Sequence, residues 1–300
     1  MLTKFLDPKN DIAFKRIFGT EKNKDILIHF LNDMVKFKEQ APIVDVTFLK
    51  TIQDPEIAFQ KVSIVDILCK DERGNAYIVE MQVASERGFE KRAQFYAAKV
   101  YVNQAKSGKS YENLKEVIFL AIVDYIMFPE KKEYKSDHVI LDKNNYEHNL
   151  RDFSFTFLEL PKFDKDIHSL DNIVDKWAYF FKHAEETTST DLKLLADEDP
   201  IIERAYEELE RHGWNANELL TYDHEEMSDL AFKGKIAAAE DKGKAEGKAE
   251  GKMEGFVEGN LQASKRIAEN LYQNGLDLQT IVNVTGLSLE ELKQQFRNNF

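Results

Sequence analysis

Residues 62–83 constrain the fold more than any other stretch, because two apolar runs there flank a polar turn that contains a glycine. This order is typical of a β-hairpin. Strand alternation places Asp66 among aliphatic side chains on one face of the first run, and it places Glu80 and Gln82 together on one face of the second run. A turn centred near Arg73 pairs residues whose numbers sum to 146, so Asp66 is expected to face Glu80 across the ladder.

These two acids define the first candidate site. Opposed side chains in a sheet lie roughly 5 Å apart at Cβ, and like charges placed there are destabilising. A divalent cation would compensate them, and Mg²⁺ is suitable because it prefers one or two carboxylates and keeps several waters. The alternative is that Asp66, Glu80 and Gln82 are three exposed polar residues on a sheet edge. Spacing alone favours this alternative, because the pattern is short.

Apolar periodicity predicts further strands and helices around the hairpin. Residues 116–128 form the most apolar run, whose length indicates a central strand covered on both faces. Other strands are expected at residues 44–49, 138–141 and 152–160. A short helix with Asn10 or Asp11 as its N-cap is expected to end at Gly19, and further helices are expected at residues 24–35, 89–107, 170–186, 201–211 and 222–241. This order indicates an α/β core followed by helices.

Residues 242–260 form a repeat, KGKAEGKAEGKMEGFVEGN, with glycine at every fourth position. In a helix each glycine costs about 1 kcal/mol relative to alanine. The glutamates would also stack as like charges four residues apart, so such a helix is marginal in isolation. Two interpretations stay open: a helix that needs a partner chain against its glycine stripe, or a semi-helical linker.

Residues 261–300 have a compact three-helix pattern, with helices expected at 261–272, 278–284 and 289–296. The order of helix, tight glycine-bearing turn and helix is that of a helix-turn-helix. However, Glu290 and Glu291 in the last helix oppose contact with phosphates. We therefore favour a protein-contacting bundle over one that reads DNA.

Charge and cysteine content limit the classes of function. The net charge of −13 argues against a nucleic-acid binder, but the charge is uneven. Residues 1–110 carry 18 basic and 15 acidic side chains, a net of +3, whereas residues 111–300 carry 23 and 39, a net of −16, so the N-terminal part can face phosphates. A single cysteine, Cys69, excludes an internal disulfide. With no signal segment or membrane-spanning run in the pattern, a soluble cytoplasmic protein with no membrane contact is expected.

Four blocks of sequence occur in order along residues 1–240: PKNDIAFKRIFG from Pro8, ILIHFLNDMV from Ile26, VDIL to YIVEMQ in the hairpin, and RAQF to YIMF from Arg92. In this order they resemble the Rpn family of recombination-promoting nucleases, which belongs to the PD-(D/E)XK nuclease superfamily. The resemblance implies a restriction-endonuclease-like α/β core, with a mixed central sheet flanked by helices. It also implies metal-dependent, transposase-related cleavage of DNA.

The resemblance assigns roles to individual residues. Asp66 and Glu80 match the two metal-binding acids, and Asp11 matches an early acid that would complete the site. The alternative for Asp11 is a helix N-cap. Gln82 stands where the wider superfamily has lysine, although glutamine is usual within this family. An amide only orients a water or donates neutral hydrogen bonds, so activity would be weaker than with lysine.

The sequence therefore predicts a Mg²⁺-dependent DNA endonuclease, with Mn²⁺ or Ca²⁺ as alternative ions. Gln82 would place the attacking water, and Arg92 and Lys15 are candidate phosphate contacts. The rival is a catalytically weak or inactive DNA-associated oligomerisation protein on a degenerate nuclease fold. Action on RNA stays open, because nothing in the sequence reads a 2′-hydroxyl.

The expected organisation has four parts. They are a nuclease core at residues 1–165, a helical extension at 166–241, the repeat at 242–260 as linker or helix, and the C-terminal bundle at 261–300. The repeat and the bundle together are the candidate surface for forming a homo-oligomer.

Overall fold

The computed structural model describes residues 3–35, 41–53, 63–105, 110–196 and 199–296. The chain divides into two compact units, Met1–Asp229 and Leu230–Phe300. The first unit has an α/β fold and the second is helical. The boundaries expected at residues 165, 241 and 260 remain predictions.

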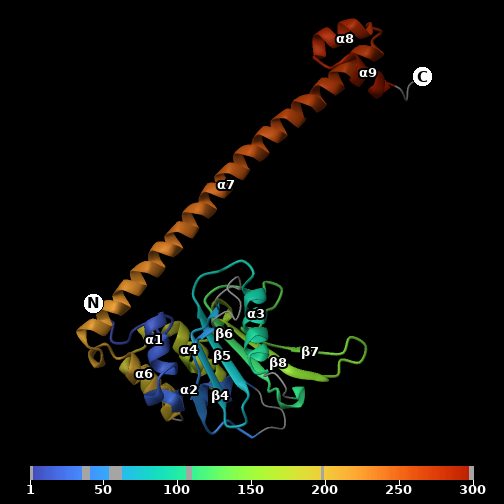
Figure 1. The fold of residues 1–300 in the computed structure, drawn as a ribbon. Coiled ribbons are helices and arrows are strands. Elements are labelled where there is room, and N and C mark those ends of the chain that lie inside the picture. Colours follow the sequence, from blue (N-terminus) through green and yellow to red (C-terminus); the bar gives the residue numbers. More distant parts are fainter. Residues whose placement is uncertain (1–2, 36–40, 54–62, 106–109, 197–198, 297–300) are drawn as a thin grey trace. The chain divides into compact units, whose positions relative to one another are not determined.

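A six-stranded sheet forms the centre of the first unit (Figure 1). In spatial order its strands are β1 (Val46–Phe48), β4 (Ile67–Asp71), β5 (Ala76–Gln82), β6 (Val117–Val123), β8 (Leu150–Glu159) and β7 (Lys135–Ile140). β6 pairs in parallel with both β5 and β8, and the other neighbours are antiparallel, so the sheet is mixed as predicted. β2 (Ile52–Gln53) and β3 (Ser63–Ile64) form a separate two-stranded pair.

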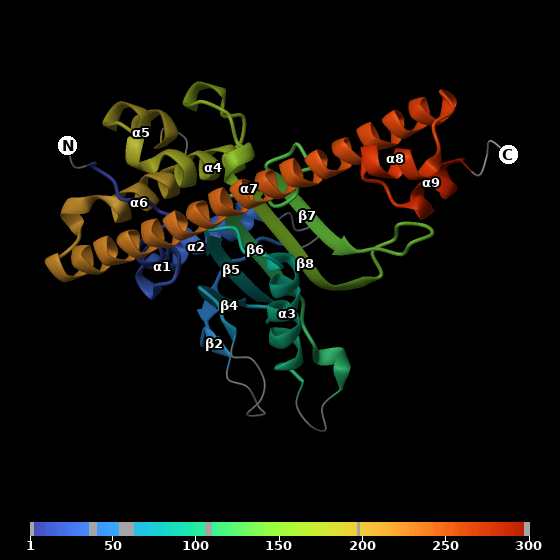
Figure 2. The ribbon, with the colours of Figure 1, turned by 90° about the horizontal axis from the view of Figure 1, so that it is seen from above.

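Helices cover both faces of this sheet (Figures 1 and 2). One face, here the α1 face, packs against α1 (Asp11–Phe18), α2 (Lys24–Met34), α4 (Ile173–His183) and α6 (Pro200–Leu209). The other, the α3 face, packs against α3 (Phe89–Val102). α5 (Ser189–Ala196), which the sequence pattern did not predict, lies between α4 and α6 in the chain. Short 3-10 helices occur at Glu21–Asn23, Tyr111–Asn113, Leu160–Lys162, Ile167–Ser169, Ala184–Glu186 and Arg211–Gly213. This layered arrangement confirms the predicted fold class.

β6 is the central strand, as its apolar sequence predicts. Its alternate residues enter different cores: Leu120 points to the α1 face and Phe119 to the α3 face, and both are fully buried. The strand is nevertheless shorter than the predicted 116–128. Beyond its last residue the chain is held as a loop, because the backbone N–H of Met127 donates to the buried Glu159 carboxylate at 2.6 Å.

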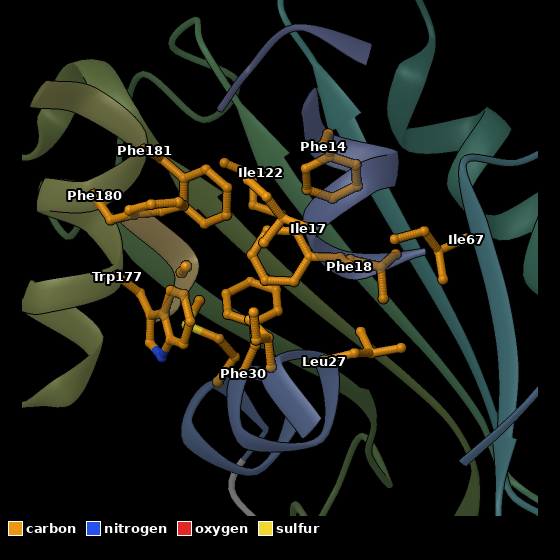
Figure 3. Packing of buried hydrophobic residues seen from close by; sticks show 14 of the residues in the cluster. Phe14, Ile17, Phe18, Leu27, Phe30, Ile67, Ile122, Trp177, Phe180 and Phe181 are labelled. Atoms are coloured by element: carbon orange, nitrogen blue, oxygen red, sulfur yellow. The ribbon is translucent and has the colours of Figure 1, made fainter. Parts of the chain in front are cut away.

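Aromatic rings fill the core of the α1 face (Figure 3). Phe18, Phe30, Trp177 and Phe181 are fully buried, and the ring centroids of Phe30 and Trp177 are 5.1 Å apart in an edge-on arrangement. The indole N–H of Trp177 donates to Asp33 Oδ2 at 2.8 Å, so burial leaves it partnered. Because these rings come from α1, α2 and α4, one core joins the start of the chain to a helix that follows the sheet.

The β4–β5 hairpin has the predicted register, since Leu68 pairs with Ile78. The prediction of one continuous strand from Val62 was wrong in its first half, because the chain leaves the ladder around Val65 and β3 pairs with β2 instead. Val65 consequently shares a core with Leu68, whereas strict alternation would separate them. The cause is a contact from outside the hairpin: the Val65 N–H donates to the Thr51 carbonyl at 3.2 Å. Val62 itself lies outside the described residues.

Other predicted helices occur with shifted ends. The helix expected at 170–186 begins at Ile173 because the side chain of Asn172 caps it. The helix expected at 89–107 ends at Val102, since Gln104 turns away and exchanges two hydrogen bonds with the backbone of Lys115, at 2.8 and 3.1 Å. Residues 106 and 107 of that prediction lie outside the described residues.

A single helix, α7 (Ala216–Gln273), replaces the two helices predicted at 222–241 and 261–272 and includes the repeat between them. It begins in the first unit and continues through the second. A Cβ added to any glycine of the repeat would meet no atom within 4 Å in the described structure. The repeat is therefore helical, and its glycine stripe is open.

The second unit ends in two short helices, α8 (Leu278–Thr285) and α9 (Leu289–Phe296). They pack with the end of α7 around a small core that contains Ala268, Ile281 and Leu292. This is the three-helix order that the sequence predicts. Across the described helices, none combines the length and the apolar character that crossing a membrane requires.

Candidate active site

The start of β4 and the end of β5 meet at one edge of the sheet. Because the two strands are antiparallel, Asp66, immediately before β4, lies beside Glu80 near the end of β5. Two parallel neighbours end at the same edge, where Gln82 is level with Val123 and Val123 with Glu159. In open α/β sheets, ligands bind outside the carboxyl ends of such strands. The acids found in the sequence therefore converge where this fold favours a site.

The carboxylates of Asp66 and Glu80 each accept a hydrogen bond from a backbone N–H group of the other's strand segment. The Asp66 N–H donates to Glu80 Oε1 at 3.3 Å, and the Met81 N–H donates to Asp66 Oδ2 at 2.9 Å. Within the described residues, the other oxygen of each carboxylate accepts no hydrogen bond. Each acid is thus fixed by one oxygen and offers the second to a ligand.

Burial raises the pKa values of both acids. It raises the pKa of Asp66 to about 6, against the lowering effect of the Met81 N–H. Burial, and then the charge of Asp66, raises the pKa of Glu80 to about 8; Glu80 is only 4% exposed. The cations of Lys15 and Arg92 lower the pKa of both acids but do not cancel the rise. Burial and mutual repulsion therefore both disfavour two negative charges on this pair.

This donor set fits a hard divalent cation. Mg²⁺ takes oxygen ligands, usually one or two carboxylates with several waters. A cation between Asp66 and Glu80 would remove the repulsion that raises their pKa values. Over the residues that the structure describes, no cluster of three His, Cys, Asp or Glu side chains is arranged to hold a metal, so waters or substrate oxygens would complete the shell.

Asp11 lies in the first turn of α1, but it is not the helix cap. Asn10 is the cap, since its side chain accepts from the Ile12 N–H at 3.0 Å. The carboxylate of Asp11 instead pairs with Lys15 Nζ at 2.7 Å. The charges of both residues act on Asp66, so this ion pair faces the acidic edge without joining it directly. Its part in the site remains a prediction.

Arg92 brings a positive charge to the site from α3. Its guanidinium donates to Gln82 Oε1 and to the carboxylate of Glu86. Gln82 Nε2 in turn donates to the Ala84 carbonyl at 3.1 Å. Arg92 Nε is buried and has no hydrogen-bond partner among the described residues. Both ends of the Gln82 amide are therefore engaged by the protein, and one of them holds Arg92.

Sequence reasoning missed Glu86 and Tyr125. Glu86 stands in the loop before α3, outside any periodic pattern. Tyr125 follows β6; its hydroxyl is buried without a partner in the described structure, and burial raises its pKa to about 12. The charges of Arg92 and Glu86 both act on Tyr125, so the three lie on the same face. Glu86 contacts Arg92 through the irregular loop before α3, and Tyr125 comes near Arg92 from a segment distant in sequence, so apolar periodicity marks neither residue.

Comparison with known proteins gives two family matches. The family described as PD-(D/E)XK nuclease family transposase matches residues 8–239, and the one described as Rpn/YhgA-like nuclease family, C-terminal HTH domain, matches residues 261–297. No curated protein and no solved structure gives a significant match to the chain. The first match covers well over half of the chain, and the two together confirm the resemblance of the sequence blocks.

Proposed function

The chain belongs to the PD-(D/E)XK nuclease family of transposases, and we propose that it is a divalent-metal-dependent endonuclease that hydrolyses phosphodiester bonds in DNA. One observation carries this proposal. The buried acids Asp66 and Glu80 converge at the carboxyl edge of the parallel strands, and each leaves one oxygen without a partner among the described residues.

In this proposal Asp66 and Glu80 hold Mg²⁺, with Mn²⁺ or Ca²⁺ as alternatives. When bound, the ion would supply Lewis-acid polarisation of the phosphodiester and a lowered pKa for a bound water. The acids themselves need no rearrangement, because the backbone N–H groups of Met81 and Asp66 already fix one oxygen of each. This preorganisation supports a binding role rather than a purely structural one.

Arg92 would stabilise the negative charge of the phosphate, in place of the lysine that is missing at position 82. A guanidinium binds phosphate oxygens in a bidentate manner. Glu86, the counter-ion of Arg92, is 52% exposed at its side chain and can yield to a phosphate. Gln82 would hold the guanidinium in place and, once Arg92 turns to the phosphate, orient the attacking water.

Lys15 and Asp11 would act in support. Lys15 is half-exposed and its charge acts on both metal-binding acids, so it can contact the same phosphate. The hydrogen bond and charge of Asp11 raise the pKa of Lys15 despite the opposing effect of burial, which keeps the ammonium charged at any pH of interest. Asp11 thus orients a cation, and it could also add a water-mediated ligand to the metal.

We further propose that the C-terminal unit assembles copies of the chain. The match to a helix-turn-helix family supports contact with DNA, but Glu290 and Glu291 are exposed at the start of α9 and oppose phosphate contact. The open glycine stripe of α7 suits the approach of a second helix. A catalytically weak, DNA-associated oligomer is accordingly the second candidate function, favoured by the absence of lysine at position 82.

Cleavage of supercoiled plasmid tests the proposal. Purified full-length chain should nick plasmid DNA in Mg²⁺ and not in EDTA, and Asp66→Ala should lower the rate at least about 100-fold, because a metal ligand is lost. Asp164→Ala is the matched control, since Asp164 is an exposed acid far along the chain from the site, and it should cut normally. An RNA of the same length in parallel reactions identifies the substrate. Unchanged nicking by Asp66→Ala would show that the site is elsewhere.

Calorimetric titration separates the two candidate functions. The wild-type chain should release or absorb heat on binding Mg²⁺ or Mn²⁺, and Glu80→Ala should not. If neither protein gives metal-dependent heat, the degenerate oligomerisation protein is favoured.

A further inference from the structure

The exposed surface of α3 carries an aromatic ring among cations. Phe95 is 47% exposed although it lies in the middle of the helix. Lys91 and Arg92 precede it by four and three residues, and Lys99 follows it by four, so all three are its neighbours on the helix surface. Glu90, the one acid in the sequence of α3, is turned about 140° away from Phe95. The charged neighbours of this ring on α3 itself are therefore basic.

This ring lies next to the candidate active site. The rings of Phe95 and Tyr96 have centroids 6.3 Å apart, and the Arg92 guanidinium lies over the Tyr96 ring at 5.9 Å. Arg92 in turn donates to Gln82 in β5. The charges of Glu80 and Asp66 also reach Tyr96. A path of contacts thus leads from Gln82, in the same strand as Glu80, through Arg92 and Tyr96 to Phe95.

A solvent-exposed phenyl ring beside cations has one chemical use that fits a nuclease. Bases stack on aromatic side chains while lysine and arginine follow the phosphates, and the combination is typical of single-strand binding. Paired bases are stacked on their neighbours and offer no face to such a ring. Lys91 is exposed and Arg92 borders the acids, so a strand whose phosphate reaches Arg92 passes Phe95.

We propose that Phe95 is a base-stacking platform and that the chain takes DNA whose bases are unpaired beside the scissile phosphate. This inference rests on the proposed nuclease function and names its substrate class. Phe95 selects the strand, Lys91 and Arg92 hold its phosphates, and Asp66 and Glu80 lie at the end of the path. A second protein is the competing occupant, but the cations around the ring suit an anionic polymer better than an apolar surface.

Binding measurements on the full-length chain test the platform. Fluorescence anisotropy in EDTA, where cleavage is absent, gives the Kd for a labelled single strand of about 15 nucleotides and for the blunt duplex of the same sequence. Phe95→Ala should weaken single-strand binding about tenfold, the loss of one stacked base, and change duplex binding less than about twofold. Phe95→Trp should restore single-strand binding, because it keeps the aromatic face.

Val102→Ala is the matched control, since Val102 is an exposed apolar residue on the same side of α3, at 64%, and should bind as wild type. In a second assay, 2-aminopurine placed along the strand should be quenched by stacking in wild type and Phe95→Trp but not in Phe95→Ala. Equal losses for both DNAs, or unchanged single-strand binding by Phe95→Ala, would overturn the platform while plasmid nicking could still stand. A wild-type chain that neither binds nor cuts any DNA would overturn the nuclease function and the platform together.

Discussion

The two faces of the central sheet use the same strands for different purposes. On the α1 face, Tyr77 and Val79 of β5 join a core of large rings that includes Phe18 and Trp177. On the α3 face, Ile78 of the same strand packs beneath α3 and the strand then ends in charged and polar side chains. One strand with period-two alternation thus contributes to a packed core on one face and to the candidate site on the other.

Three buried polar groups can be compared across the two faces. On the α1 face the indole of Trp177 has Asp33, and the buried hydroxyl of Tyr206 has Thr187 Oγ1 at 3.0 Å. On the α3 face the hydroxyl of Tyr125 is buried without a partner among the described residues. Unsatisfied buried groups are costly and are retained mainly at functional sites. The Tyr125 hydroxyl thus lacks, among the described residues, the kind of partner that Trp177 and Tyr206 have.

The largest predicted effect is on the α1 face. Phe18→Ala should lower the free energy of unfolding by roughly 3–5 kcal/mol, because it opens a cavity among Phe30, Trp177 and Phe181. Urea denaturation followed by circular dichroism measures it. Phe95→Ala on α3 is the control and should stay within about 0.5 kcal/mol, since that ring is exposed. Similar losses of unfolding free energy in the two variants would contradict the conclusion that the core of the α1 face stabilises the fold more than the exposed ring of α3.

The next largest effect is the pH dependence of the free energy of unfolding that arises from the acid pair on the α3 face. The folded-state pKa values, about 6 for Asp66 and about 8 for Glu80, lie above the ordinary values of 3.8 and 4.5. The contribution of these two groups to the free energy of unfolding is fully present below their pKa values in the unfolded chain. It is lost as the pH rises through their pKa values in the folded chain, because the unfolded chain releases its protons at lower pH. In EDTA the free energy of unfolding should therefore fall by on the order of a few kcal/mol between about pH 4.5 and 8.

Two controls identify the source of that slope. The double variant Asp66→Asn and Glu80→Gln cannot release these protons, so its stability should be nearly flat over the same range. Saturating Mg²⁺ should stabilise the wild-type chain at pH 8, by about 2.7 kcal/mol at a concentration 100 times the Kd. A slope that persists in the double variant would assign it to other groups.

The same contrast explains what the sequence could and could not predict. The hairpin register was predictable because β4 and β5 are joined by a short turn, which fixes Leu68 opposite Ile78. Apolar spacing predicted α1, α2, α3, α4 and α6 individually, whereas their arrangement around a mixed sheet was implied by the family resemblance. The break at Val65 was not predictable, because it depends on a hydrogen bond from the Val65 N–H to the carbonyl of Thr51, which belongs to another segment.

The residues of the candidate site likewise include some that the sequence predicted and some that it did not. Asp66 and Glu80 face each other through local strand geometry, so spacing was enough to pair them. Glu86 contacts Arg92 from the loop six residues before it, outside any periodic pattern, whereas Tyr125 comes under the charge of Arg92 from the segment after β6. The repeat illustrates a third case: each glycine disfavours helix, yet α7 continues through all of them.

A smaller effect is expected for the cation on the α3 face. Arg92→Lys keeps the charge but loses the bidentate geometry with which a guanidinium binds a phosphate, so kcat/KM for nicking should fall about tenfold, which corresponds to about 1.4 kcal/mol. Stability should change little. Arg87→Lys, in the exposed loop before α3, is the matched control and should retain the wild-type rate. If both variants cut equally well, Arg92 does not contact the phosphate.

The smallest effect compares one hydroxyl on each face. Tyr206→Phe removes a hydroxyl that is hydrogen-bonded to Thr187, so the free energy of unfolding should fall by about 1 kcal/mol. Tyr125→Phe removes a buried hydroxyl that the described residues leave unpartnered, so the free energy of unfolding should stay equal or rise by up to about 1 kcal/mol. If that hydroxyl is kept for the substrate, the same variant should raise KM for DNA while leaving the fold more stable. Thermal denaturation of both variants is measured beside their nicking kinetics. A loss of stability in Tyr125→Phe equal to that in Tyr206→Phe would mean that the Tyr125 hydroxyl is hydrogen-bonded like that of Tyr206.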